Sequence, residues 1–222
     1  MINSFVFIIS APSGSGKTTL VERLLQEVPG LHFSVSYTTR APRGPEQHNR
    51  EYCFVSREEF REMIAQNRLL EWAEVFGNYY GTASRFLDEA RQSGEDLLLD
   101  IDVQGAAQVK KVIPDAVSVF ILPPSRMELE ARLRRRSQDQ EDVIQKRLRD
   151  ATREIQGYGS YDFILVNDVL EQSAERLKAI VASVRSSRSG AQSNESAPLA
   201  ESCRKERVLA QIQPILASFG GS

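Results

Sequence analysis

Cysteine, net charge and long apolar runs are scarce in this sequence, and each scarcity excludes a class of protein. The two cysteines, Cys53 and Cys203, lie far apart, which argues against a disulfide framework or a cysteine metal cluster. The net charge of −2 gives no overall basic field that would attract nucleic acid or an anionic membrane. The apolar run 5–9 has no positive flank and is too short for a signal peptide or a membrane span, so we expect a cytoplasmic protein.

Short apolar runs alternate with segments of helical periodicity along most of the chain. This alternation predicts βαβ units, and therefore an α/β fold with a parallel sheet flanked by helices. The strand candidates are uniformly apolar, as expected for strands that are covered on both faces. They are Phe5–Ser10, Asp96–Ile101, Val117–Leu122 and Phe163–Val166.

Changes in composition divide the chain into further parts. One region mixes short aromatic and hydroxyl-rich runs with a helix, which predicts a small mixed α+β lobe. A highly charged region predicts two helices that form a lid, and the Ser-, Gln- and Asn-rich end predicts a flexible tail, with a weak docking helix as the alternative. The predicted parts are a core of residues 1–33 and 83–185 that includes the lid at about 125–156, a lobe of residues 34–82, and a tail of residues 186–222.

The run APSGSGKT, from Ala11 to Thr18, follows an apolar strand and precedes an amphipathic segment. It matches the phosphate-binding pattern G-x-x-x-x-G-K-[ST], except that alanine replaces the first glycine. Small residues let backbone N–H groups surround phosphate oxygens, Lys17 adds a positive charge, and the Thr18 hydroxyl is a ligand for Mg²⁺. A tight turn before an ordinary helix is the alternative, and both flanks favour the nucleotide site. The predicted ATP-binding residues are Ala11, Pro12, Ser13, Gly14, Ser15, Gly16, Lys17, Thr18 and Thr19.

Further blocks follow in the lobe and the core. They are SYTTRAPR (36–43) with Glu46, EYCFVS (51–56), EWAE (71–74), GNYYGT (77–82) and LDIDVQG (99–105). With the phosphate loop, they resemble the guanylate kinases, bacterial-type nucleoside monophosphate kinases, over about residues 5–185. The resemblance implies a P-loop kinase core with a GMP-binding lobe and a helical lid. It also implies an ATP-dependent phosphotransferase of purine nucleotide metabolism that transfers the γ-phosphoryl group of ATP to GMP, giving ADP and GDP, with Mg²⁺ as cofactor.

Two arginines and two tyrosines are the candidates for holding the GMP phosphate, and the resemblance assigns them this role. Arg40 and Arg43 lie three positions apart beside a proline, so their guanidinium groups can converge on one anion. Tyr52 and Tyr80 add neutral phenolic donors. Solvated surface arginines and packed tyrosines are the alternative for each residue taken alone, and their joint occurrence in the family's order favours the phosphate site.

Four polar residues, Ser36, Glu71, Thr82 and Asp102, are the candidates for reading the base. The Watson–Crick edge of guanine presents two adjacent N–H donors and one carbonyl acceptor. An ionised carboxylate only accepts, so Glu71 suits both donors, while a hydroxyl donates to the carbonyl. Adenine would place a lone pair against that carboxylate. We therefore expect Glu71 to set the preference for GMP.

The GMP phosphate is largely dianionic at neutral pH, so the attacking oxygen needs no general base. Catalysis then rests on positioning and positive charge. The candidates for this charge are Lys17, Arg43, Arg136 and Arg147, with Arg132 in support; for the lid arginines a charged helix surface is the alternative. Asp100 is expected to contact Mg²⁺ through water, as a partner of Thr18. The resemblance places Asn167 near the adenine of ATP, and a helix cap is an equally good interpretation of that residue.

Three other functions fit parts of the sequence. A non-catalytic guanylate-kinase-like interaction module typically has a degraded phosphate loop, whereas Gly16, Lys17 and Thr18 are intact in this sequence. A related P-loop kinase such as ribose 1,5-bisphosphokinase would not need the guanine-reading residues. A P-loop GTPase would need an Asn-Lys-x-Asp motif, which the sequence lacks. The expected partners are therefore the small molecules ATP and GMP, without nucleic acid or membrane, while activity on dGMP and the oligomeric state stay open.

Overall fold

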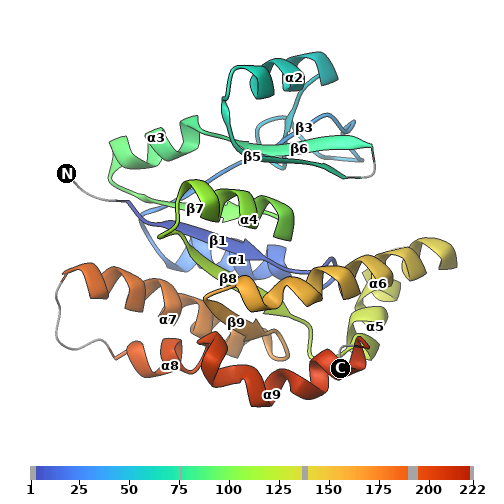
Figure 1. The fold of residues 1–222 in the computed structure, drawn as a ribbon, viewed down its shortest axis with the longest axis vertical. Coiled ribbons are helices and arrows are strands. Elements are labelled where there is room, and N and C mark those ends of the chain that lie inside the picture. The colour runs from blue at the N-terminus through green and yellow to red at the C-terminus, as the bar shows by residue number, and fades with distance from the viewer. Residues whose placement is uncertain (1–3, 76, 137–139, 190–194, 221–222) are drawn as a thin grey trace. The chain divides into compact units, whose positions relative to one another are not determined.

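A computed structural model of the chain describes residues 4–75, 77–136, 140–189 and 195–220. Contacts divide the chain into two compact units. The first unit is Met1–Ile8 with Gly30–Val117, and the second is Ile9–Pro29 with Ser118–Ser222. Strand β1 (Val6–Ser10) runs from the first unit into the second (Figure 1).

Part of a parallel sheet forms the centre of the first unit. Strand β7 lies between β2 and β1, and β2 pairs with β7 in parallel, with Leu31 opposite Asp96. The leucines at 97–99 of β7 are fully buried, as expected for a strand that is covered on both faces. The elements around this sheet are β2 (Leu31–Phe33), α3 (Arg85–Ser93), β7 (Asp96–Asp100) and α4 (Val103–Val112).

A second sheet in the first unit has the strand order β4-β3-β6-β5. Strands β3 and β4 pair in parallel, whereas β6 runs antiparallel to β3 and β5. Helix α2 begins with a capping box, in which the Ser56 hydroxyl accepts from the backbone N–H of Glu59 and the Glu59 carboxylate accepts from that of Ser56. The elements are β3 (Tyr37–Thr38), β4 (Cys53–Phe54), α2 (Arg57–Ala65), β5 (Leu69–Val75) and β6 (Asn78–Ala83), which confirms the predicted mixed α+β lobe.

The second unit contains the end of β1, followed in the sheet order by β8 and β9. Strands β8 and β9 pair in parallel, with Val119 opposite Phe163, and all four predicted core strands agree with the structure to within one residue. None of the helices in the described part of the chain is both long and apolar enough to cross a membrane. The elements are α1 (Lys17–Glu27), β8 (Val117–Leu122), α5 (Arg126–Arg136), α6 (Glu141–Gln156), a 3₁₀ helix (Gly157–Ser160), β9 (Phe163–Val166) and α7 (Leu170–Ser189).

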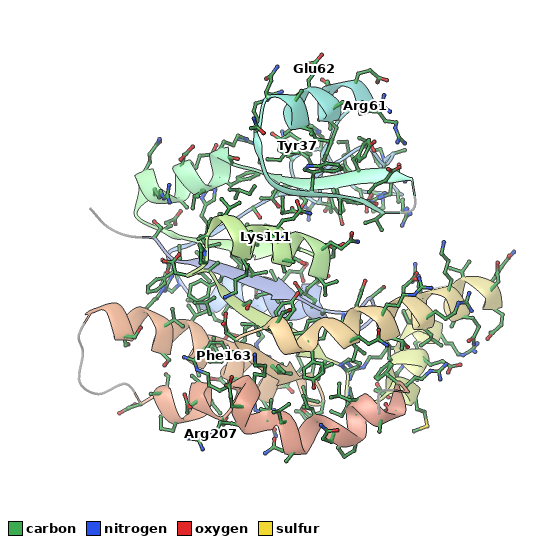
Figure 2. All side chains as sticks on the ribbon, viewed as in Figure 1. Tyr37, Arg61, Glu62, Lys111, Phe163 and Arg207 are labelled. Atoms are coloured by element: carbon green, nitrogen blue, oxygen red, sulfur yellow. The ribbon has the colours of Figure 1, made fainter. Side chains whose placement is uncertain are left out.

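The end of the chain differs from the flexible tail predicted for residues 186–222. Helix α7 continues to Ser189, and the described residues 195–220 contain α8 (Ala197–Glu201) and α9 (Lys205–Ser218). The backbone at Arg204 forms an antiparallel bridge with Phe163 of β9, which is labelled in Figure 2. The Arg204 guanidinium lies over the Phe163 ring. Although this part of the chain is rich in polar residues, its apolar residues recur at helical spacing, so α9 can bury one face. Its buried residues are Val208, Ile212 and Leu216, while residues 190–194 and 221–222 lie outside the described residues.

Candidate active site

The predicted phosphate loop joins β1 to α1 in the second unit. Gly14 and Gly16 have φ angles of 91° and 86°, which glycine adopts at little cost. The backbone N–H of Ser15 donates to the carbonyl of Pro12 over 3.1 Å, which closes the turn. Gly16 is the N-cap of α1, and no side chain caps this helix. The loop therefore directs an uncapped helix N-terminus toward the place where a phosphate would bind.

The side chains of Asn167 and Leu133 pack against the phosphate loop. The Asn167 amide donates to the carbonyl of Ser15 over 2.7 Å and lies where a Cβ on Gly16 would project. A Cβ on Gly14 would come within 2.9 Å of Leu133 on α5. Glycine at these positions thus allows close packing as well as an unusual backbone angle. The sequence placed Asn167 near adenine, whereas its side chain contacts the loop backbone in this structure.

The charged lid helices α5 and α6 carry the predicted lid arginines. Arg147 is half-buried on α6, whereas Arg136 ends α5 and its side chain lies outside the described residues. The neighbouring Arg134 pairs with Glu141 over 2.6 Å, and mainly this contact lowers the pKa of Glu141 to about 2. Arg132 donates to the backbone carbonyl of Asn167 over 3.0 Å, so α5 is tied to the residue that holds the loop. The catalytic roles of Arg136 and Arg147 stay predictions.

Two predicted base-reading residues form a row across β5 and β6 in the first unit, and a third lies next to the first residue of β3. Glu71 on β5 is directly opposite Thr82 on β6. Tyr37, the first residue of β3, is opposite Gly81, and Ser36 directly precedes Tyr37 in the chain. Directly opposite residues in antiparallel strands project from the same face of a sheet. The Thr82 hydroxyl is buried and lies beside the Glu71 carboxylate, whose pKa it lowers.

Glu71 is the buried acid of this row, with 5% of its surface exposed. Burial raises the pKa of Glu71 to about 7; the nearby Thr82 opposes the rise and the charge of Asp102 adds to it. A Cβ on Gly105 would come within 2.5 Å of the Glu71 carboxylate, so any larger residue there would displace that carboxylate. Asp102 accepts from the backbone N–H of Gly105 over 2.8 Å as the N-cap of α4. The sequence indicated Asp102 as a base reader and missed both its capping role and the need for Gly105.

The predicted phosphate-binding residues meet around Arg40, which is 9% exposed. Its guanidinium makes two hydrogen bonds to Glu46, of 2.9 and 3.0 Å, and lies 5.2 Å from the centre of the Tyr52 ring. The Tyr52 and Tyr80 rings meet edge to face at 6.0 Å. Arg43 is exposed, and its backbone N–H also donates to Glu46, over 2.7 Å. The structure therefore brings Arg40, Tyr52 and Tyr80 together and holds Arg43 beside them.

Glu46 contacts two predicted phosphate-binding residues, although the sequence reasoning left it without a role. It orients the Arg40 side chain and the Arg43 backbone, and Arg40 is the main cause that lowers the pKa of Glu46. Hydrogen bonds to Glu46 and to the carbonyl of Ala41 use three of the five guanidinium N–H donors of Arg40. At most two donors then remain for a phosphate. The signal in the sequence was an acid placed shortly after two arginines.

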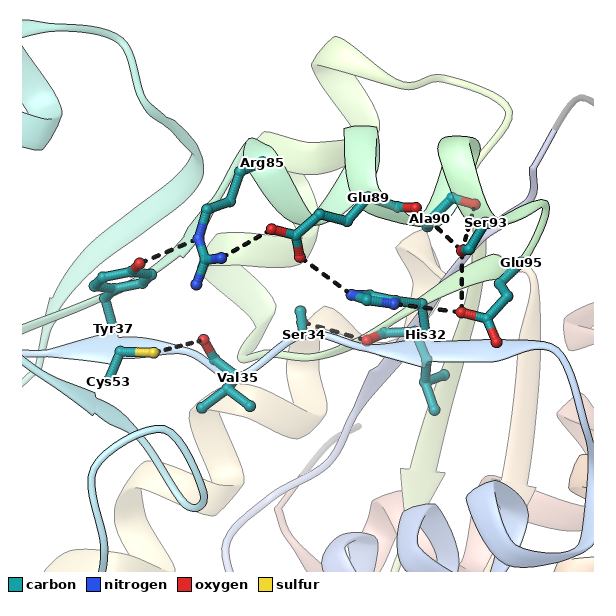
Figure 3. A network of polar contacts seen from close by, with 11 residues as sticks. His32, Ser34, Val35, Tyr37, Cys53, Arg85, Glu89, Ala90, Ser93 and Glu95 are labelled. Carbon is teal, nitrogen blue, oxygen red and sulfur yellow. Dashed lines mark hydrogen bonds and ion pairs between the residues drawn. The ribbon is translucent and has the colours of Figure 1, made fainter.

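A polar network fixes the strand next to Ser36, as Figure 3 shows. Arg85 on α3 donates to the Tyr37 hydroxyl over 3.3 Å and pairs with Glu89 over 2.8 Å. His32 lies between two carboxylates, 3.5 Å from Glu89 and 3.4 Å from Glu95. The network joins β3 to α3 and β2 within the first unit, on the residue that follows Ser36.

The predicted metal ligands lie in different units. Thr18 is exposed in the first turn of α1 in the second unit, and Asp100 is half-buried at the end of β7 in the first. Within the described ranges, no group of three or more His, Cys, Asp or Glu side chains could hold a metal ion. A hydroxyl and a carboxylate nevertheless fit Mg²⁺, which commonly keeps several waters and binds through one or two carboxylates and substrate phosphates.

The fold and the two sites define the chain as an α/β protein of the P-loop kinase class. The family model described as guanylate kinase matches residues 4–184. The chain therefore belongs to the guanylate kinase family.

Relatives and a solved structure agree with this assignment. The guanylate kinase of Koribacter versatilis is 55% identical over 221 residues, which cover 96% of this chain and 95% of that protein. The guanylate kinase of Geobacter metallireducens is 46% identical and covers 93% of this chain and 94% of its own length. The crystal structure of guanylate kinase from Anaplasma phagocytophilum superposes with a TM-score of 0.65 at 32% identity, covering 93% of this chain and 97% of that one.

Proposed function

We propose that the protein transfers the γ-phosphoryl group of ATP to GMP, giving ADP and GDP. The buried Glu71 carboxylate in one row with the Thr82 hydroxyl is the observation that carries this proposal. A buried carboxylate with a raised pKa beside a buried hydroxyl suits a ligand that brings two N–H donors and a carbonyl acceptor. Membership of the guanylate kinase family and an intact phosphate loop support the same function.

The first unit would bind GMP. Glu71 accepts the two N–H donors of guanine, and Ser36 or Thr82 donates to its carbonyl. Asp102 remains close to the base while it caps α4. The phosphate lies with Arg40, Arg43, Tyr52 and Tyr80, and Glu46 keeps Arg40 in place before GMP arrives. Side chains that are already fixed lose little entropy on binding, which favours affinity.

The second unit would bind ATP. The backbone of residues 11–19 surrounds the phosphates, Lys17 contacts the β- and γ-phosphates, and Asn167 holds the loop through Ser15. Thr18 would be the Mg²⁺ ligand of this unit, and Asp100 of the first unit stays a predicted ligand through water. When bound, Mg²⁺ neutralises charge on the phosphate oxygens.

The chemistry needs little more than positioning and charge. An oxygen of the dianionic GMP phosphate forms a bond to the γ-phosphorus while the bond from that phosphorus to the β–γ bridging oxygen breaks, and ADP leaves. Lys17, Arg43, Arg136 and Arg147 stabilise the charge that spreads over the transferred group. No protein group has to remove a proton from the nucleophile, and the cytoplasm stays the expected location.

The direct test is ADP production from ATP in the presence of Mg²⁺, with GMP, AMP, CMP and UMP offered separately. We expect rapid turnover with GMP and slow turnover with the other three. Equal rates with all four acceptors, or no ADP with GMP, would contradict the proposal. A chain that bound GMP tightly without turning over ATP would instead be an interaction module.

A further inference from the structure

Strand β5 lies at the edge of the four-stranded sheet, where β6 is its neighbour among the strands that the structure describes. Every second residue of an edge strand directs its N–H and C=O away from the sheet, where a neighbouring strand would otherwise bind them. At Trp72 one side chain takes both groups. The Gln108 amide oxygen accepts from the Trp72 N–H over 3.2 Å, and its amide nitrogen donates to the Trp72 carbonyl over 2.7 Å.

This pair of hydrogen bonds acts on the backbone of the base-reading acid. The N–H of Trp72 belongs to the same peptide group as the carbonyl of Glu71, so Gln108 fixes the plane that follows the Glu71 Cα. The pairing of β5 with β6 shifts register between Leu69 and Glu71. The pairing of β5 with β6 is therefore irregular just before Glu71. This makes the hydrogen bonds that Gln108 forms on the other edge of β5 more important.

Gln108 also sets the distance between α4 and β5. Gly105 and Gln108 are three residues apart and lie on the same face of α4. The helix thus meets β5 at two points, with the Glu71 carboxylate against Gly105 and the Trp72 peptide against Gln108. A small change in the position of α4 would open the contact at Gly105 and let the carboxylate turn.

We propose that Gln108 is a positioning residue that holds the Glu71 carboxylate in the orientation that reads guanine. Gln108 contacts the backbone of β5 and acts on the ligand through Glu71. The inference rests on the proposed function of Glu71, since it concerns how well two N–H donors of the base are accepted. It therefore concerns the choice of base and leaves ATP binding untouched.

The test compares GMP with IMP, which lacks the 2-amino group and so offers Glu71 one N–H donor fewer. Gln108→Met keeps an unbranched side chain and removes both hydrogen bonds. We expect the preference for GMP over IMP in kcat/KM to fall by about tenfold, through KM for GMP, while KM for ATP stays within about twofold. Gln92→Met is the matched control, because Gln92 is exposed on α3 of the same unit, and it should change neither value.

A double-mutant cycle separates positioning from general stability. If Gln108 acts through Glu71, Gln108→Met should have no further effect on the GMP preference in a Glu71→Gln background. Additive losses, or a loss of thermal stability with an unchanged GMP preference, would overturn the inference. Failure of the proposed function would appear differently, as a wild-type protein that does not prefer GMP in the first place.

Discussion

The two candidate sites are built from different parts of the chain. In the second unit, the phosphate loop offers backbone N–H groups, and two glycines with positive φ allow the shape. In the first unit, the acceptor site offers side chains on one face of a sheet, among them a buried carboxylate and a buried hydroxyl. Backbone donors suit any phosphate, whereas a fixed set of side-chain donors and acceptors distinguishes one base from another.

The difference has an energetic consequence. A phosphate loop leaves its N–H groups to water when no nucleotide is bound, so the empty site costs little. A carboxylate buried to 5% exposure is penalised when it is ionised and has no ligand donors around it. The acceptor site therefore lowers the stability of the empty protein and regains that free energy when GMP binds. Substitutions in the phosphate loop and in the acceptor site should therefore differ in their effects on stability and on nucleotide binding.

The largest expected effect is on the donor side. Lys17→Met removes the mobile charge from the loop, and the loss of one charge-stabilising donor should lower kcat by about 10³. GMP affinity should be unchanged, because all eight predicted GMP-binding residues lie in the first unit. Steady-state kinetics and calorimetry with GMP measure the two quantities. A matching loss of GMP affinity would show that the two sites are not separable.

The corresponding change on the acceptor side is Glu71→Gln. Glutamine keeps the shape but presents an amide, so one guanine N–H would face an N–H and lose its acceptor. We expect kcat/KM for GMP to fall by about 10², with KM for ATP within about twofold. Turnover with GMP and AMP measured side by side would check this. Retention of the full preference for GMP over AMP would remove Glu71 from the base-reading role.

The same substitution should stabilise the empty protein at alkaline pH. Folding raises the pKa of Glu71 from 4.5 to about 7, so the folded protein binds more protons than the unfolded chain between these values. The contribution of Glu71 to the free energy of unfolding is therefore greatest below pH 4.5 and is lost as the pH rises through 7. At pH 8, Glu71→Gln should raise the free energy of unfolding by about 3 kcal/mol. Urea titrations at pH 5 and pH 8 measure it, and an equal effect at both pH values would contradict an origin in the charge of Glu71.

The sequence predicted the two sites unequally well. The loop from Ala11 to Thr18 is local, so its motif, the strand before it and the helix after it could all be identified from neighbouring residues. The row of Glu71 and Thr82 depends on strand register, and only the family resemblance connected these residues with each other and with Ser36 in advance. Register is a pairing between distant segments, which no local pattern shows.

The remaining differences have a similar cause. The dual contact of Glu46 with Arg40 and Arg43, and the close approach of Gly105 to Glu71, are tertiary contacts without a sequence pattern of their own. The polar composition of the chain's end predicted flexibility, yet Ile212 on α9 is fully buried. Composition averages over a segment, whereas packing depends on which face of a helix the few apolar residues occupy.

The smallest expected effect is that of a substitution at Asn167. It distinguishes a side chain that supports the phosphate loop from one that contacts adenine. Its amide is buried and donates to the Ser15 carbonyl, so Asn167→Ala should leave that carbonyl without its partner and loosen the loop. We expect KM for ATP to rise by about tenfold, with KM for GMP within about twofold.

Inorganic tripolyphosphate decides between the two roles of Asn167, because it has the phosphates of ATP and no adenine. If Asn167 supports the loop, Asn167→Ala should weaken binding of tripolyphosphate and of ATP by the same factor in calorimetry. If Asn167 instead contacts adenine, only ATP binding should weaken. The first result would show that the donor site, although made of backbone, depends on one distant side chain, just as the acceptor carboxylate depends on the glycine beside it.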